Sequence, residues 1–171
     1  MANRRTMLTL FLSSYAPLLL IFGIFMASKN LWLSIGLMLA SIGSIMQLLR
    51  FLKEASTLTS HSVIAQTVQS RDGEAMSYIV TYLLPFLGID FSKWENGVAL
   101  IILFVILGIL YVNSNLIYVN PMLNLFGYHI FELQTSEGKL SALIARRKYV
   151  KNGEAVNVVS LGNYVIMEKI Q

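Results

Sequence analysis

Long runs of apolar residues, almost free of charge, constrain this chain more than any other feature. An α-helix needs about 20 predominantly apolar residues to cross the hydrocarbon core of a bilayer. Four runs near that length occur, at about residues 7–27, 31–49, 75–91 and 97–118. Charged residues make up only 13% of the chain, against about 25% in typical soluble domains. The pattern predicts an α-helical membrane protein with four transmembrane helices.

The four runs differ in how clearly they are marked. Only residues 28–30 separate the first two, which predicts an antiparallel helical hairpin, because no other connection that short can return across a bilayer. The third run is the weakest, since it contains Thr81 and Pro85. The fourth is the clearest, with no polar side chain between Val98 and Leu110.

The distribution of Lys and Arg predicts the orientation, because short basic segments beside membrane helices stay in the cytosol. Eleven of the 13 basic residues fall in the N-terminal segment, the loop 50–74 or the tail, and only Lys29 and Lys93 fall in the other two loops. We therefore expect a multi-pass protein of the bacterial inner (cytoplasmic) membrane, with both the N-terminus and the C-terminus cytosolic.

Residues 120–171 read as a second, cytosolic domain rich in β-structure, after a transmembrane domain over 1–119. Pro121 opens this tail, and four β-prone segments follow, at 128–134, 140–147, 155–161 and 164–170. Asn152-Gly153, between the second and third segments, is typical of a two-residue β-hairpin turn. A sheet this small is not stable alone. We therefore expect the loop 50–74 to add a strand at 61–68, giving a small module made of the tail and the loop between spans two and three.

Residues that could carry chemistry are few. The apolar runs contain no Asp, Glu, Lys, Arg or His in their cores, whereas ion-coupled transporters depend on such residues. The chain has no cysteine, and its two histidines, His61 and His129, stand alone without companions at metal-ligand spacing. No Gly-rich phosphate loop opens a helix. We therefore assign no catalytic, cofactor or metal residue and expect a protein that is not an enzyme.

A stripe of small residues marks the second run. Gly36, Ala40 and Ser44 recur every four residues, so they share one helix face and allow another backbone to approach closely. Packing within the predicted helical bundle is one interpretation. The other is a homo-oligomer interface, most plausibly in a tetramer.

The densest group of charges lies in the tail, at Arg146, Arg147, Lys148 and Lys151. The simpler interpretation is the positive-inside signal itself or contact with anionic lipid, to which each nearby cation contributes about 1 kcal/mol. The alternative is a docking surface for an acidic protein or nucleic acid. A handful of cations without interleaved aromatic residues is weak support for nucleic acid, so lipid contact is the preferred interpretation.

Three segments carry a resemblance to a known family: residues 82–87 (YLLPFL), residues 115–128 (NLIYVNPMLNLFGY) and the strand at 130–132 (IFE). They resemble the KwaA family, the membrane subunit of the Kiwa antiphage defence system of bacteria. The resemblance implies a cytosolic partner subunit, KwaB, which binds DNA and acts as the effector. It also implies that the membrane subunit senses phage at the envelope and holds or releases that partner. The family has no catalytic residues to transfer to this chain.

Two functional hypotheses follow. The first is a non-enzymatic membrane scaffold or sensor that recruits a cytosolic partner through its β-rich tail and middle loop. In it, a change in the membrane would alter helix packing and so the affinity for the partner. Nucleic acid would be reached only through that partner. The alternative is a pore-forming or channel-like effector that conducts through a hydrophobic constriction.

Overall fold

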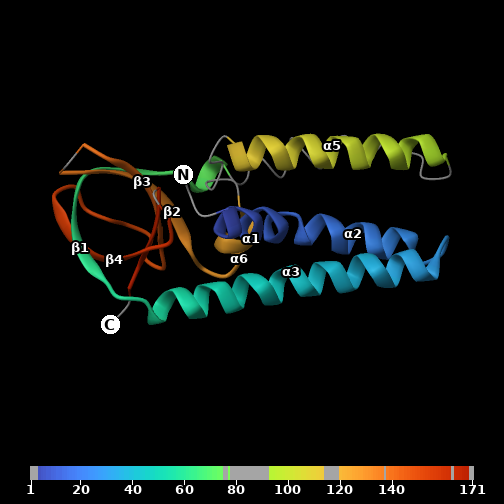
Figure 1. Ribbon diagram of the computed structural model, residues 1–171, viewed down its shortest axis with the longest axis horizontal. Helices are drawn as coiled ribbons and strands as arrows, with labels where there is room; N and C mark the ends of the chain where they lie inside the picture. Colours follow the sequence, from blue (N-terminus) through green and yellow to red (C-terminus); the bar gives the residue numbers. More distant parts are fainter. Residues whose placement is uncertain are drawn as a thin grey trace.

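The computed structural model describes residues 4–74, 77, 93–113, 120–136, 138–162 and 164–169. Long helices lie side by side and meet a closed β-barrel at one end (Figure 1). In chain order the elements are α1 (Arg4–Ser14), α2 (Ala16–Met26), α3 (Leu31–Thr57), β1 (His61–Ser70), α5 (Trp94–Asn113), α6 (Pro121–Leu125), β2 (His129–Thr135), β3 (Leu140–Ala145), β4 (Glu154–Ser160) and β5 (Val165–Glu168).

The first apolar run forms two helices, α1 and α2, bent by 41° at Tyr15. Pro17 has no backbone N–H to continue the helix, which favours a break at this position. Before the bend, the hydroxyls of Ser13 and Ser14 donate back to carbonyl oxygens one turn earlier, at 2.9 and 2.7 Å. Such bonds often accompany helix bending.

The predicted helical hairpin between the first two runs is confirmed, because α2 and α3 pack along each other. The Asn30 side chain caps α3 by accepting from the Leu33 N–H at 3.1 Å. Two serines of α3 then donate to α2 carbonyls: Ser34 to Gly23 at 2.6 Å and Ser41 to Ala16 at 2.8 Å. Small side chains allow this close approach, as they do between helices in membranes.

The barrel closes in the strand order β1-β2-β3-β5-β4. All neighbouring strands are antiparallel except β3 and β5, which pair in parallel. The expected strand from the middle loop is confirmed, since β1 pairs with both β2 and β4 and so completes the closure. The four tail segments predicted as strands correspond closely to β2, β3, β4 and β5. Closure leaves no unpaired strand edge on the barrel.

The barrel has two cores. Its interior is filled from one face of the strands, by residues such as Phe131, Leu143 and Val158. The opposite face of β3 and β5 packs on the helices, where Ile144 joins the same cluster as Leu48 of α3. This double burial explains why β3 is almost uniformly apolar rather than alternating in polarity.

The predicted hairpin at Asn152-Gly153 is wrong. β3 and β4 do not pair with each other, because β1 and β5 occupy both edges of β4. Gly153 does adopt positive φ, at 81°. The turn is instead anchored on β1: the Gly153 N–H donates to the Ala65 carbonyl at 2.7 Å, and the Asn152 side chain accepts from the Val68 N–H at 2.9 Å.

The predicted fold class, an α-helical membrane protein with four transmembrane helices, is also wrong, because the described residues hold at most two candidate spans beside a closed five-stranded barrel. Within the described ranges, α3 is the one helix long and apolar enough to cross a membrane, and α1 with α2 qualifies only if the bent pair counts as one span. The apolar helix Glu95–Tyr111 is shorter. The run at 75–91 falls, apart from Ser77, outside the described residues. The number of apolar residues in a run did not predict the number of spans, because it does not show where a helix bends, as between α1 and α2, or where it ends, as in α5.

Candidate functional site

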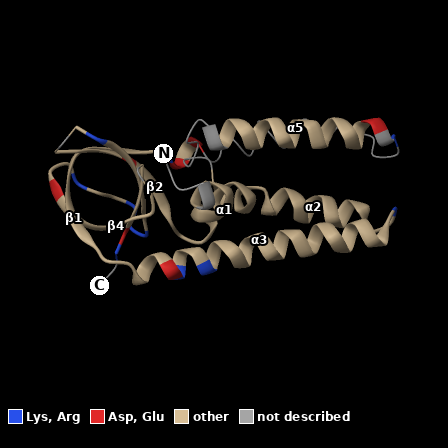
Figure 2. Cartoon of the chain, in the orientation of Figure 1, with Lys and Arg blue, Asp and Glu red and all other residues tan. Residues whose placement is uncertain are grey.

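Charge is sharply divided along the molecule (Figure 2). Lys and Arg occur on the barrel, at the barrel end of α3 and at the far tips of the helices, while α2, residues 31–49 of α3 and α5 carry none. Along α2, the apolar part of α3 and α5, large hydrophobic side chains face outward, among them Ile24 at 61% exposure, Trp32 at 84% and Ile101 at 66%. We call this charge-free surface the apolar belt.

The four basic residues singled out from the sequence do not form one surface. Arg146, Lys148 and Lys151 are exposed. Arg147 instead holds strands together, because its guanidinium pairs with Glu154 of β4 and, at 3.0 Å from Nε to Oε1, with Glu168 of β5. The Arg147 side-chain hydrogen bond, with one from the Lys151 N–H, lowers the pKa of Glu154, whereas burial raises the pKa of Glu168.

Two hollows flank this basic segment. One, of about 540 Å³, follows β4 and β5 beside Arg147. The other, of about 420 Å³, lies between the barrel and the end of α3, and we call it the junction groove. Arg146, Glu168 and Lys169 line both hollows, and Lys53 of α3 lines the junction groove. Sequence reasoning did not group Lys53 and Lys169 with Arg146, because no local pattern links positions so far apart.

The small-residue stripe of the second run is split by the fold. Ser44 is buried and donates to the Ser41 carbonyl at 2.7 Å, whereas Gly36 and Ala40 are exposed. The face of α3 that packs within the chain is another one, made of Ser34, Ser41, Ser44, Leu48, Leu52 and Ala55. This packed face also has a regular spacing, because every seventh residue belongs to it: Ser34, Ser41, Leu48 and Ala55. The four-residue spacing of Gly36, Ala40 and Ser44 did not reveal it. The homo-oligomer interface at Gly36 and Ala40 stays a prediction.

A second polar cluster fastens the segment after β1 to β2. Asp72 accepts from the Ile130 N–H at 2.9 Å, and its other oxygen lies 2.6 Å from His129 Nδ1. Arg71 contacts Glu74 at 2.7 Å and Glu132 at 3.1 Å. His129 is thus held by a carboxylate partner, while His61 is exposed at the start of β1. Among the residues that the structure describes, no three His, Asp or Glu side chains gather closely enough to hold a metal ion.

The fold defines a two-part protein. Its helices expose apolar side chains, and the barrel at one end of them carries charged side chains. The chain belongs to the KwaA family: the model of the family described as "Anti-phage protein KwaA" matches residues 6–167. The resemblance seen in the sequence is therefore confirmed, and the family to which the chain belongs is one of anti-phage proteins.

A curated relative agrees with this assignment. The Kiwa protein KwaA of Escherichia coli is 32% identical over 87 residues, which cover 49% of this chain and 45% of the relative. The aligned part thus spans about half the length of that relative. No solved structure matches this chain.

Proposed function

We propose that this chain is a non-enzymatic membrane scaffold or sensor in anti-phage defence. Its helical layer lies in the bacterial inner membrane, and its barrel lies in the cytosol, where it recruits and regulates a DNA-binding effector of the KwaB type. The observation that carries the proposal is the contrast between an uncharged, outward-facing apolar belt and a barrel with charged side chains on its surface.

The dimensions of α3 support a membrane location. Its charge-free part, from Leu31 to Leu49, is about 28 Å long at a rise of about 1.5 Å per residue. The hydrocarbon core of a bilayer is about 30 Å thick. Only 22% of the apolar window of α3 is buried within the chain, so this helix is not the core helix of a water-soluble domain. An exposed apolar surface of this extent marks contact with a membrane or with other proteins.

Buried contacts between the helices and the barrel support a sensing role. The Thr6 hydroxyl of α1 donates to the Leu161 carbonyl, just after β4, at 3.0 Å. Asn120 caps α6, the short helix that leads into β2, and holds it on α1 by donating to the Leu10 carbonyl and to the Ser13 hydroxyl, each at 2.9 Å. A change in helix packing would therefore move groups that hold the barrel, which is the physical coupling that a sensor requires.

The membrane orientation can be tested by labelling, because the chain contains no cysteine that would interfere. The variant Lys29→Cys places a thiol in the turn between α2 and α3. That thiol should react with a membrane-impermeant maleimide in intact spheroplasts. A cysteine at Lys151, on the barrel, should react only after lysis. As a control, Ile42→Cys, within the apolar belt, should react only after denaturation. Labelling of Lys151→Cys in intact spheroplasts would contradict the cytosolic placement of the barrel.

Recruitment can be tested at the exposed basic residues. The double variant Lys148→Glu/Lys151→Glu should weaken capture of the cytosolic effector by about tenfold or more, because like charges at an interface cost several kcal/mol. Arg147 is left intact, since it holds the barrel strands. The control is Lys139→Glu, an exposed charge reversal at the opposite end of β3.

Capture should be measured in detergent as well as in membranes, so that lost lipid contact is not mistaken for lost docking. Full capture by the double variant, or an equal loss with Lys139→Glu, would contradict docking at this surface.

A further inference from the structure

The junction groove combines three cations that come from three separate parts of the chain. Lys53 lies on α3, Arg146 follows β3, and Lys169 follows β5. The Lys169 ammonium donates to the Leu58 carbonyl at 3.1 Å, just after the end of α3. The Arg146 guanidinium lies over the ring of Tyr128, 5.0 Å from the ring centroid. These contacts hold two of the three cations in place before any ligand arrives.

Among the described residues that line the groove, Glu168 is the one carboxylate, and it is already engaged. Glu168 lies 3.0 Å from Arg147 Nε, so it does not neutralise the three lining cations. Glu54, beside Lys53 on α3, does not line the groove. The electrostatic character of the groove is therefore positive, and its complementary ligand is an anion.

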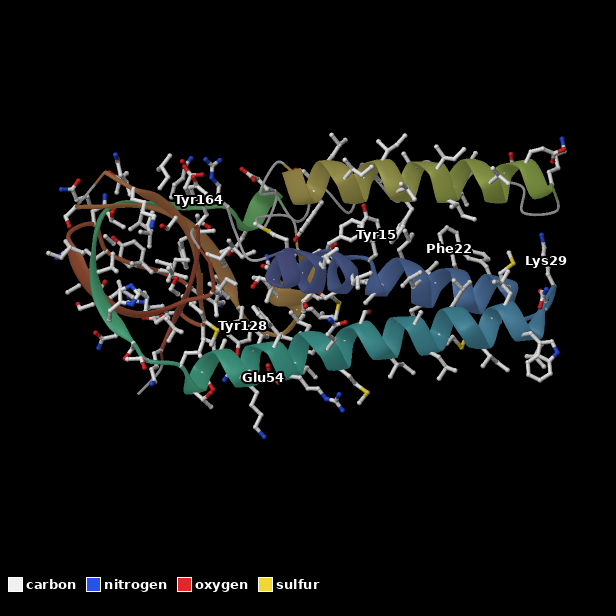
Figure 3. All side chains as sticks on the ribbon, in the orientation of Figure 1. Tyr15, Phe22, Lys29, Glu54, Tyr128 and Tyr164 are labelled. Carbon is white, nitrogen blue, oxygen red and sulfur yellow. The ribbon has the colours of Figure 1, made fainter. Side chains whose placement is uncertain are left out.

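The groove also has an apolar side. Leu49 and Leu52 of α3 and Phe126 after α6 line it together with the cations. Leu49 is the last residue of the charge-free part of α3, and Lys53 lies about one turn beyond it. Figure 3 shows Tyr128 between the barrel and these last turns of α3. The groove thus begins at the edge of the apolar belt and ends among cations, over the depth at which lipid head groups lie in a bilayer.

We propose that the junction groove binds the phosphate group of an anionic phospholipid, such as phosphatidylglycerol. The phosphate lies among Lys53, Arg146 and Lys169, and the start of an acyl chain lies against Leu49 and Leu52. The inference rests on the membrane location proposed above, and it adds a specific lipid site at the joint between helices and barrel. A free phosphate shares the head-group chemistry but has no apolar part to cover the leucines.

The test uses the full chain, purified in a neutral detergent, with short-chain phosphatidylglycerol, phosphatidylcholine and inorganic phosphate as separate ligands. The wild type should bind phosphatidylglycerol in preference to the other two, as measured by native mass spectrometry and by fluorescence titration. Lys53→Gln and Arg146→Gln should each weaken phosphatidylglycerol binding by about fivefold, the factor that corresponds to one nearby cation. Lys139→Gln, an exposed cation that does not line the groove, is the matched control and should bind normally.

Arg146→Lys distinguishes charge from stability, because it keeps the cation and should restore most of the affinity. Equal binding of phosphatidylcholine, competition by millimolar inorganic phosphate, or an equal loss with Lys139→Gln would overturn the lipid site. The membrane proposal is tested separately by fractionation of cells: a wild type absent from the membrane fraction contradicts that proposal. A wild type present there but without preference for phosphatidylglycerol contradicts only this inference.

Discussion

Replacing Leu143 with Asp should unfold the barrel and abolish protection against phage, while the chain remains in the membrane fraction. The Leu143 side chain is 0% exposed and packs inside the barrel with Phe131 and Val158. Its strand, β3, pairs with both β2 and β5, and a carboxylate at this position would be surrounded by apolar side chains. A buried, unpaired charge costs several kcal/mol, on the order of 3–5. That is a large share of the stability of a small domain.

The matched control is Leu140→Asp. Leu140 lies on the same strand but is 54% exposed, so its replacement should change stability by about 0.5 kcal/mol or less. Limited proteolysis of the solubilised protein measures barrel unfolding, carbonate extraction measures membrane retention, and plaque counts measure protection. Protection that survives in Leu143→Asp despite a proteolysed barrel would contradict a function located in the barrel.

Asn120→Asp should loosen α6, the short helix that leads into β2, from α1 with little change in shape. The Asn120 side chain is fully buried, and its amide group donates to the Leu10 carbonyl and to the Ser13 hydroxyl. Its oxygen accepts from the Met122 N–H at 3.0 Å and so caps α6. A carboxylate keeps the cap but loses both donated bonds, and it places negative charge against a carbonyl oxygen. The cost should be about 2–4 kcal/mol, because a buried group then lacks its partners.

Asn157→Asp, on the exposed face of β4, introduces the same chemical change where water can solvate it. We expect it to leave stability and protection unchanged. Hydrogen exchange of the detergent-solubilised protein should show α1 and α6 opening faster in Asn120→Asp, with barrel strands protected as in the wild type. Unchanged exchange in α1 and α6 would show that Asn120 does not hold these two helices together.

The strands were predictable from the sequence because each depends on local features. β-prone runs separated by turns at Gly138 and Asn152-Gly153 correspond to β2, β3 and β4, and the strand His61–Ser70 was expected in the middle loop. Their pairing was not predictable. An Asn-Gly turn predicts that flanking strands meet, but in the barrel both edges of β4 are taken by β1 and β5. Which strand pairs with each edge of β4 depends on the arrangement of all five strands in the barrel.

The candidate site was predicted only in part, for the same reason. Arg146, Lys148 and Lys151 are exposed as a basic segment should be, whereas Arg147 is drawn into ion pairs with Glu154 and Glu168. Adjacent residues in sequence thus differ in role because β3 ends between two other strands. Lys53 and Lys169 join Arg146 only because the barrel packs against the end of α3.

The sequence by itself determined the family, the apolar character of the helices, the strand segments and the confinement of charge to the barrel and helix ends, because each follows from residue types over short stretches. Tertiary structure decided where the first run bends, which face of α3 packs, how the barrel closes and which cations share a groove. These depend on contacts between distant residues, such as Ser41 with Ala16 and Asn120 with Leu10. A hydrogen bond or a packed face between distant residues cannot be read from the sequence of either segment alone.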